Sequence, residues 1–337
     1  MRNSSYAMVI AIVLLSSQVG CKKLAQTGAR LLAADAGETA SAEAETATVD
    51  DDAALNGLVD CVNGLDSDIS KSLERYTSWL PDAKEGAPQP GPTGKETSVW
   101  GLYKITEHEV STCEKGLKVA SAKPEYKELS EKFKAVADKI VPAINEANTY
   151  YDRKDYKDDK FAKGKELHAK LWPLAEEFFT VSHDFRATVA KANDVRMEAE
   201  LKEVEAKQGR NLLFQKLNVM KHAKASVRVA TEEKAPLIEL EPLLVAYEKA
   251  VEEMKTYASS HKDETGKVMM WSMYENKVED YLKVLKDRVR RVRDKKGYTS
   301  GEIRLLEAGS GWMVEGSTAK VSREYNELVS RSNGLRL

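Results

Sequence analysis

The chain has 337 residues, of which 42% are hydrophobic and 31% are charged, and its formal net charge is −2. This apolar share is too high for a disordered chain, and 19 Gly with 9 Pro exclude collagen-like or low-complexity sequence. Three cysteines exclude a disulfide-dense miniprotein, and a net charge near zero gives no reason to expect nucleic acid as a partner. The length suffices for roughly one to three domains with a core.

Residues 1–20 have the layout of an export signal. Arg2 precedes the unbroken apolar run 7–15, and small and polar residues follow this run up to Gly20. The run is about nine residues long, whereas a membrane-spanning helix needs roughly twenty. The sequence therefore predicts a signal peptide over residues 1–20 instead of a transmembrane anchor.

Cys21 directly follows Gly20, and this arrangement resembles the bacterial lipobox, in which the cysteine is acylated and becomes the new N-terminus. The usual lipobox has Leu three positions before the cysteine, where this chain has Gln18. The alternative is an ordinary signal peptide cleaved nearby, with Cys21 as a spare thiol. Lys22 stands where Asp would retain such a protein in the inner membrane. We therefore expect a palmitoylated lipoprotein of the outer membrane that faces the periplasm, and surface exposure stays an open alternative.

Residues 21–52 are predicted to be a solvated linker behind this anchor. Between residues 24 and 52 there is one basic residue, Arg30, against seven acidic residues, and no helical or strand period continues past Ala34. Low hydrophobicity with charge of one sign is typical of a disordered segment. A flexible linker of this length reaches about 30 Å.

From residue 53 to residue 337 the helical period dominates. Apolar residues step by three or four positions in several stripes, among them Leu58, Val62, Leu65, Ile69, Leu73 and Tyr76, and later Val278, Tyr281, Leu285, Val289 and Val292. No run alternates with a period of two, so we expect no sheet. The sequence predicts an all-α, elongated bundle of about seven or eight helices, with breaks near 81–98, 122–124, 153–163, 209–211, 232–236, 259–268, 294–300 and 308–316.

Three prolines, Pro142, Pro173 and Pro242, fall inside this helical pattern, and we expect them to kink or split their helices. The stretch 164–207 is long enough for a coiled-coil arm. Its apolar stripe is mostly lost after Phe185, which favours a bundle helix with a polar extension.

Cys61 and Cys113 lie on or beside the stripes of the first two predicted helices. Export places both in an oxidising compartment, and with Cys21 acylated they are the two cysteines available for a disulfide. Such a bond would contribute roughly 4 kcal/mol on the chain-entropy model. The alternative is two buried free thiols.

A stretch between Tyr150 and His168, YYDRKDYKDDKFAKGKELH, resembles the signature of the YiiG-like bacterial lipoproteins, a family of domains of unknown function. Further matching pieces occur in the family's order: Arg75-Tyr76, Trp79-Leu80, Gly91-Pro92-Thr93-Gly94, Cys113-Glu114-Lys115-Gly116, Arg290-Arg291-Val292-Arg293-Asp294, Trp312-Met313-Val314-Glu315 and Arg323-Glu324-Tyr325-Asn326-Glu327. The resemblance implies an exported, all-helical lipoprotein without an assigned activity. It also supports the pairing of Cys61 with Cys113, and it supplies no catalytic residues.

Several short motifs resemble known sites but lack essential residues. The stretch 155–166 has acids where a calcium loop needs them, but Lys160 replaces the required Gly, and we expect Asp158 or Asp159 to cap the next helix instead. The Ser-x-x-Lys at Ser317 lacks its companion motifs, so Ser317 is interpreted as a helix N-cap. In the stretch 91–96, Glu96 stands where a phosphate loop needs Ser or Thr.

The five histidines lack zinc-ligand spacing, and the spacing of 54 acidic residues is uninformative. We therefore predict no catalytic, cofactor-binding or metal-binding residues, and no cofactor.

The strongest polar cluster is the basic run that contains Arg288, Arg290, Arg291 and Arg293. One interpretation is a solvated helix end whose cations complement the helix dipole. The other is an anion-binding face for lipid phosphates or cell-wall carboxylates. Trp312-Met313 is interpreted as a plug at the bundle end, with an apolar anchor as the alternative.

The functional hypothesis is a lipid-anchored, non-enzymatic binding or structural module in the periplasm. Its expected partners are the membrane, through the anchor, and an envelope protein or anionic envelope polymer. The alternative is a periplasmic hydrolase that acts on cell-wall or lipid substrates through carboxylates that the sequence cannot rank.

Overall fold

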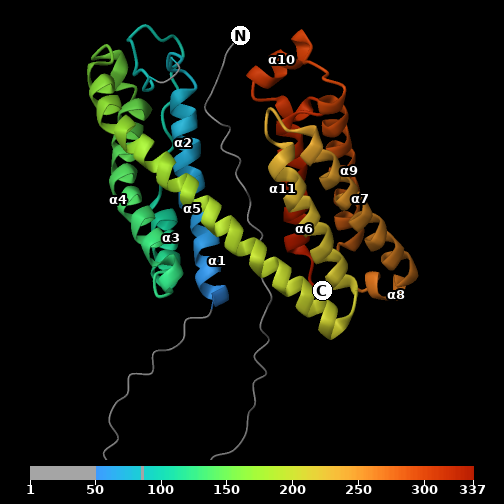
Figure 1. Ribbon diagram of the computed structural model, residues 1–337. Helices are drawn as coiled ribbons and strands as arrows, with labels where there is room; N and C mark the ends of the chain where they lie inside the picture. The colour runs from blue at the N-terminus through green and yellow to red at the C-terminus, as the bar shows by residue number, and fades with distance from the viewer. Residues whose placement is uncertain (1–50, 85–86) are drawn as a thin grey trace, which may run out of the picture.

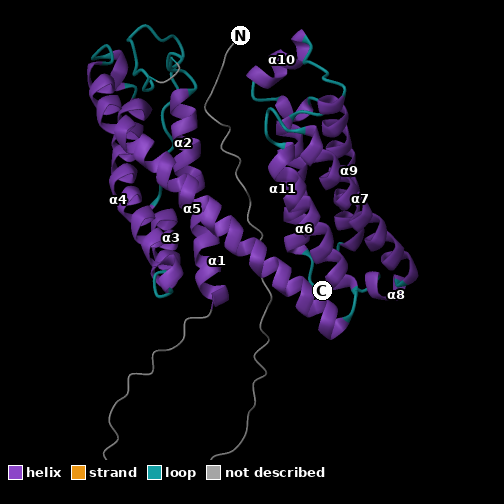
Figure 2. Cartoon of the chain, in the orientation of Figure 1, coloured by secondary structure: helices purple, strands orange, loops and turns teal. Residues whose placement is uncertain are grey.

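The structure is a computed structural model that describes residues 51–84 and 87–337, and all regular elements of these residues are helical (Figure 2). The all-α prediction is confirmed. The predicted signal peptide, Cys21 and the linker up to residue 50 lie outside the described residues. Within the described part, none of the helices combines the length and apolar character that a membrane crossing needs.

The helices follow the predicted breaks closely. In chain order the elements are α1 (Asp51–Cys61), the π-turn η1 (Val62–Asp66), α2 (Ser67–Thr77), α3 (Glu107–Ala120), α4 (Pro124–Arg153), η2 (Asp155–Lys157), α5 (Ala162–Gln208), α6 (Leu212–Ala230), α7 (Leu237–Ser260), α8 (Lys262–Thr265), α9 (Trp271–Arg293), α10 (Ser300–Glu307), η3 (Gly311–Met313) and α11 (Thr318–Gly334). The number is slightly above seven or eight, partly because the break expected at 259–268 contains the short helix α8.

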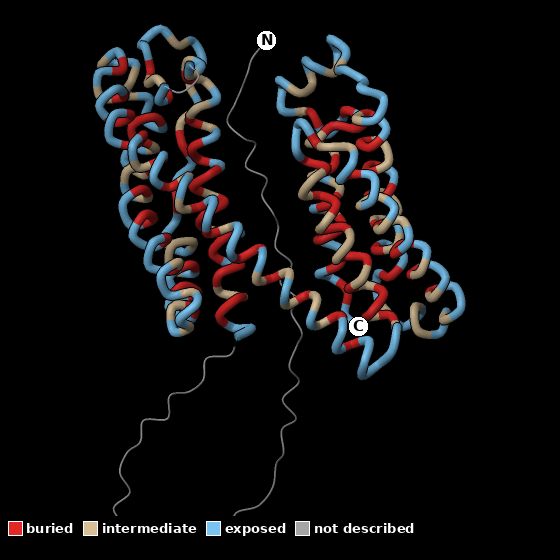
Figure 3. The backbone as a smooth tube through the Cα atoms, in the orientation of Figure 1, coloured by how far each residue is buried: buried red, intermediate tan, exposed pale blue. Residues whose placement is uncertain are grey.

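The helical body contains two large apolar cores, one in each of two bundles that stand side by side (Figures 1 and 3). The first lies among α1 to α4 and the N-terminal half of α5, and the rings of Phe133 and Phe185 stack in it with centroids 4.3 Å apart. The second lies among α6, α7, α9 and α11 and is rich in buried tyrosines. Tyr281 is completely buried there and contacts both Tyr247 and Tyr325. Fully buried aromatic side chains supply large apolar areas to both cores.

Helix α5 links the two cores, as its diagonal course in Figure 1 shows. It has 47 residues and is therefore about 70 Å long. Its first half contributes side chains from Leu167 to Ala190 to the first core. Farther along, Leu201 and Val204 pack against Phe214 and Leu217 of α6 in a small third cluster. The polar extension expected after Phe185 is therefore the connecting part of a bundle helix and not a free coiled-coil arm.

The three internal prolines do not split their helices. Pro142, Pro173 and Pro242 lie inside α4, α5 and α7, each of which continues on both sides of its proline. An internal proline costs about 3 kcal/mol or more. In α4 and α5 the buried apolar faces extend along both flanks of the proline, and we infer that their burial outweighs this cost.

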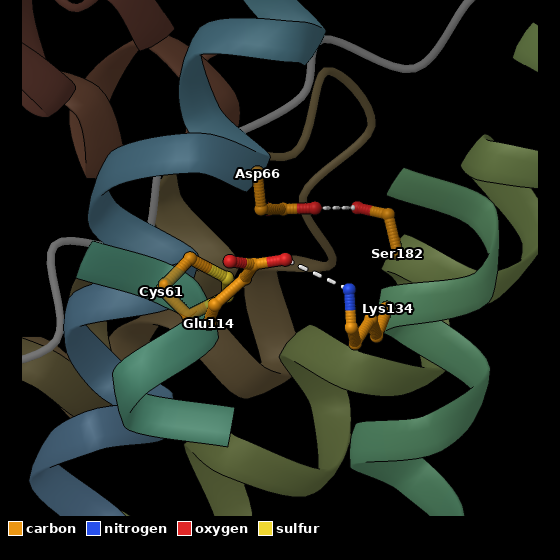
Figure 4. The surroundings of a disulfide bond; sticks show 6 residues. Cys61, Asp66, Glu114, Lys134 and Ser182 are labelled. Atoms are coloured by element: carbon orange, nitrogen blue, oxygen red, sulfur yellow. Dashed lines mark hydrogen bonds and ion pairs between the residues drawn. A yellow bond between two sulfur atoms is a disulfide. The ribbon is translucent and has the colours of Figure 1, made fainter. Parts of the chain in front are cut away.

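A disulfide joins Cys61 at the end of α1 to Cys113 in α3, with 4.3 Å between the Cα atoms (Figure 4). Both residues are almost completely buried. Beside the bond, the Nζ of Lys134 donates a hydrogen bond of 2.8 Å to Glu114 (Figure 4). The loop that the disulfide closes contains η1, α2 and the long connection 78–106. The bond therefore holds the start of α3, where this connection ends, against α1.

A buried polar group follows the disulfide at the π-turn η1. The carboxylate of Asp66 accepts a hydrogen bond of 2.5 Å from the Ser182 hydroxyl of α5 and forms an ion pair with Arg186 (Figure 4 shows Asp66 and Ser182). Burial raises the pKa of Asp66, whereas the Arg186 guanidinium and these hydrogen bonds oppose that rise. Arg186 also donates to the Ser70 hydroxyl at 2.9 Å, so the group holds the π-turn and the start of α2 against α5.

Candidate binding site

Segments far apart in the sequence meet at one end of the first bundle. The end of α2, the end of α4 and the start of α5 contribute aromatic rings there, and the connection 78–106 folds over them (Figure 1). Tyr76 contacts Trp79, Tyr151 and His168 with ring centroids 5.6 to 5.9 Å apart, and Trp79 also contacts Phe161. Two of the sequence pieces that carry the family resemblance, residues 75–80 and 150–168, therefore contribute to one aromatic cluster.

His168 is the polar centre of this cluster. Its Nδ1 lies 3.1 Å from the Tyr76 hydroxyl, and its Nε2 lies 2.9 Å from the carbonyl oxygen of Gln89. Because that carbonyl can only accept, Nε2 carries the proton and Nδ1 accepts from Tyr76. Burial lowers the pKa of His168 although the Gln89 carbonyl opposes this, so the ring is neutral at pH 7. Both ring nitrogens are occupied, and His168 therefore fastens the connection to α5 instead of acting as a base.

The loop between α4 and α5 is also fixed by this cluster. The Tyr150 hydroxyl donates to Asp159 at 2.8 Å, and the second carboxylate oxygen of Asp159 accepts from the backbone N–H of Lys163 at 2.9 Å. Asp159 thus accepts from the first turn of α5, but from two residues before the N-cap position, which is Phe161. Lys154, Lys160 and Phe161 adopt φ values between 54° and 65°, which reverse the chain tightly.

In the stretch 91–96, which partly matches a phosphate loop, the side chain of Glu96 is hydrogen-bonded to residues of the same loop. Glu96 accepts hydrogen bonds from the backbone N–H and hydroxyl of Thr93 and from the N–H of Gly94, at 2.5 to 2.8 Å. Burial opposes ionisation of Glu96, but these hydrogen bonds outweigh it and lower its pKa. The side chain of Glu96 therefore takes the place that an anion would need in this loop.

Residues 99–105 form an extended strap between α2 and α4. From α2, Ser72 donates to the carbonyl of Tyr103 and Arg75 to that of Gly101, and just after α2 the Trp79 indole donates to that of Trp100, at 2.7 to 3.0 Å. From α4, Asn148 donates to Leu102 at 2.8 Å, and Asn145 makes two hydrogen bonds with the backbone of Ile105. Leu102 and Ile105 are buried beneath the strap. Side chains on both flanks thus provide the hydrogen bonds that a neighbouring strand would provide in a sheet.

The outer face of the strap carries two exposed rings. Trp100 is 53% exposed and Tyr103 is 50% exposed. The guanidinium carbon of Arg75 lies 5.3 Å from the Trp100 ring and 4.6 Å from the Tyr103 ring, and one of its nitrogens donates to the Tyr103 hydroxyl at 2.9 Å. We call Arg75, Trp100 and Tyr103 the aromatic platform. The platform could not be predicted from the sequence, because no spacing rule links an arginine on a helix to rings that lie 25 and 28 positions later.

A pair of interacting carboxylates, Asp68 and Glu109, lies near the base of the strap. Burial raises the pKa of Asp68, and the neighbouring Glu109 adds to this rise. Burial also opposes ionisation of Glu109, but hydrogen bonds from Thr106 lower its pKa. Thr106 and Glu109 form the capping box of α3, and Asp68 pairs with Lys71 at 3.1 Å. Glu109 therefore caps α3, whereas Asp68 forms an ion pair within α2.

The four arginines of the predicted anion-binding face do not share one surface, because two of them are buried. Arg288 is 4% exposed and donates to the carbonyls of Ala230, Glu232 and Gly316 at 2.6 to 3.4 Å. Arg291 is also buried and pairs with Glu302 of α10 at 2.5 Å. These two guanidinium groups therefore join segments of the second bundle.

The other two arginines of the run lie at the surface. Arg290 pairs with Asp287 and Arg293 with Asp294, each at about 2.9 Å or less. The helical period explains the division, because positions 288 and 291 follow the buried stripe of α9 and positions 290 and 293 do not.

Trp312 does not seal the end of the second bundle. It is 44% exposed and lies under the guanidinium of Arg323 at 4.0 Å, and Met313 is 56% exposed. The neighbouring Val314 is buried instead. The interpretation of Ser317 as an N-cap is confirmed, because its hydroxyl accepts from the N–H of Lys320 at 3.1 Å.

These features define an all-helical protein with a rigid, partly exposed aromatic surface at one end of its first bundle. The chain belongs to the family described as "Protein of unknown function (DUF3829)", whose model matches residues 51–334. It is 35% identical over 290 residues to "Uncharacterized protein YiiG" of Escherichia coli (strain K12), an alignment that covers 85% of this chain and 79% of the relative. The suspected family resemblance is thereby confirmed. No solved structure matches the chain.

Proposed function

We propose that this protein is an exported lipoprotein, held in the outer membrane by acylated Cys21, whose helical body is a non-enzymatic binding module in the periplasm. The three cysteines support export to the periplasm, because two of them form a disulfide and the third follows a signal-like segment. Cys61 and Cys113 are joined inside the first bundle, and disulfides persist in oxidising compartments. Cys21 remains, directly behind the signal-like run 7–15. Two or more acyl chains on it would give durable attachment.

The aromatic platform is the surface that favours a binding role. Trp, Tyr and Arg dominate the energetics of protein interfaces, and all three meet here. The strap beneath the platform is held by side chains from two helices, so Trp100 and Tyr103 lose little backbone freedom when a partner binds. Arg75 adds a charge that is already oriented by Gly101 and Tyr103. We propose another envelope protein as the partner.

A photo-crosslinking amino acid placed at position 100 in living cells tests this proposal. We expect a defined crosslinked protein from position 100, and we expect Tyr103→Ala to reduce its yield at least severalfold. The same amino acid at Ile238, which is 84% exposed on α7 far from the platform, is the matched control. Identical products from both positions, or no product from position 100, would contradict a binding role for the platform.

Membrane attachment is tested separately with Cys21→Ala. We expect this variant to leave the membrane fraction while it keeps the unfolding midpoint of the parent protein. A variant that still sediments with membranes would contradict the anchor and would leave the platform experiment unaffected.

A further inference from the structure

A group of exposed apolar side chains lies at the turn between α8 and α9 and at the C-terminus. Met269 is 80% exposed, Met270 is 39%, Met273 is 51% and Leu337 is 47% exposed. A Cβ atom built on Gly334, the last residue of α11, would lie 3.5 Å from the Cε of Met270, so the end of α11 lies beside this turn. We call the three methionines and Leu337 the methionine patch. Exposed apolar side chains that gather in this way mark surfaces for a partner or a membrane.

The turn that carries the patch is held by the core beneath it. Trp271 is 6% exposed, and its ring contacts that of the buried Tyr274 with centroids 5.5 Å apart. The backbone N–H of Val268 donates to the carbonyl of Thr265, and that of Trp271 donates to the carbonyl of Val268, at 3.2 Å each. The methionines therefore project from an ordered segment, which loses little backbone freedom when the patch is covered.

The local structure does not explain a methionine at position 270. Met270 is the N-cap of α9, its φ is 66°, and its side chain makes no capping hydrogen bond. Glycine suits a positive φ, and Ser, Asp or Asn suits an N-cap because its side chain accepts a hydrogen bond from the start of the helix. A long apolar side chain assists the turn in neither way. Its chemistry instead suits a contact with an apolar environment outside the chain.

The patch lies at the end of the molecule where the N-terminal segment joins the helical body. In Figure 1 the start of α1, α8 and the C-terminus all lie at the lower end, whereas the end of α2 and α10 lie at the upper end. About 30 residues separate Cys21 from Asp51, the first residue of α1, and they span at most about 100 Å. A chain anchored through Cys21 is thus held by the end that carries the patch, within reach of the bilayer.

We propose that the methionine patch contacts the phospholipid surface of the membrane in which Cys21 is anchored. The apolar side chains enter the boundary between lipid headgroups and acyl chains. Lys267 and Arg336, which are exposed next to the patch in the sequence, lie among the lipid phosphates. The contact directs the opposite end of the first bundle, with the aromatic platform, away from this membrane. This inference rests on the proposed lipid anchor.

The test places the fluorophore NBD on Met269→Cys in the full, acylated chain, reconstituted into vesicles of phosphatidylethanolamine and phosphatidylglycerol. The new thiol is labelled selectively, because Cys21 is acylated in this proposal and Cys61 and Cys113 are joined. Lipids with a spin label near the headgroup quench NBD on contact. We expect severalfold quenching at position 269. Ile238→Cys, which replaces an 84% exposed side chain at the start of α7, at the upper end, is the matched control and should stay unquenched.

A second variant tests the apolar character of the patch. In the labelled chain, Met270→Ser/Met273→Ser should reduce the quenching at position 269 severalfold. Both side chains are exposed, so the unfolding midpoint should stay close to that of the parent. Unchanged quenching in this variant would overturn the role of the methionines.

Flotation of the same vesicles reports the anchor separately. A chain that floats without quenching at position 269, or with equal quenching at positions 269 and 238, would overturn the membrane contact and leave the anchor in place. A chain that does not float would contradict the anchor on which the inference rests. A shift of the NBD emission that grows with protein concentration in the absence of lipid would assign the patch to a second copy of the chain and would also overturn the proposal.

Discussion

Gly57 of α1 and Gly116 of α3 face each other at a distance that leaves no room for a side chain. A Cβ atom built on Gly116 would lie 2.3 Å from the carbonyl oxygen of Gly57, and one built on Gly57 would lie 2.6 Å from the Cα of Gly116. Four residues after Gly57 and three before Gly116, the disulfide joins the same two helices. The two glycines therefore allow the close packing that places Cys61 beside Cys113.

The first prediction concerns this contact. Gly116→Ala should lower the free energy of unfolding by about 1–3 kcal/mol, because the backbones of α1 and α3 must separate to admit the methyl group. Gly64→Ala is the matched control, since nothing lies within 4 Å of a Cβ there. We expect it to be neutral or slightly stabilising. Urea unfolding of both variants measures the difference, and an equal effect of the two would contradict the close contact.

The second prediction concerns the disulfide. The double variant Cys61→Ala/Cys113→Ala should lose about 4 kcal/mol of stability, because the bond closes a loop with a sequence separation of 52 residues. Titration of unfolded, unreduced protein should find neither thiol free. Two reactive thiols from these positions would show that the bond does not form in the cell.

The third prediction compares how a buried and an exposed arginine of the basic run contribute to stability. Arg288→Met should cost about 3 kcal/mol, since it leaves the buried carbonyl of Ala230 without its donor and also removes the hydrogen bond to Glu232. Arg293→Gln should change stability by less than about 0.5 kcal/mol, because Arg293 is exposed and its ion pair with the neighbouring Asp294 is a surface pair. Thermal unfolding of the two variants provides the comparison. Similar losses would mean that Arg288 has no special structural role.

The fourth prediction is a pH dependence centred on His168. Its pKa is lowered in the folded protein from the ordinary 6.5, so the unfolded chain binds a proton that the folded chain does not. The stabilising contribution is therefore complete above pH 6.5 and is lost as the pH falls toward the folded pKa, by at most about 1.4 kcal/mol per pH unit.

His168→Gln removes this titrating group while keeping a polar side chain. We expect the stability of the parent to fall more steeply than that of the variant between pH 7 and pH 5.5. Parallel curves in urea unfolding would show that His168 is not buried and neutral as described.

The helices could be predicted from the sequence because each needs only its own apolar stripe, as in α9 with Val278, Tyr281 and Leu285. The breaks were equally local, since Gly209 and Pro236 end or precede helices by backbone geometry alone. The division into two cores was not predicted. It depends on which apolar stripe packs against which, and the single helix α5 contributes to the first core and to the small third cluster that joins it to α6.

The candidate site illustrates the same limit. The resemblance singled out Arg75, Trp79 and the loop before His168, but nothing in their spacing indicates that the strap carrying Trp100 and Tyr103 lies between them. The basic run could be identified in the sequence. The burial of Arg288 and Arg291 could not, because it depends on carbonyls and a carboxylate from other segments. Long-range partners of this kind are decided by packing, which one sequence does not reveal.

The most direct measurement is the mass of the N-terminal peptide of the protein purified from bacterial membranes, without reduction. The account predicts a peptide that begins at Cys21 and carries acyl chains, together with a peptide pair linked by Cys61 and Cys113. An unmodified Cys21, or a chain that retains residues 1–20, would contradict the lipid-anchored module at the centre of the account.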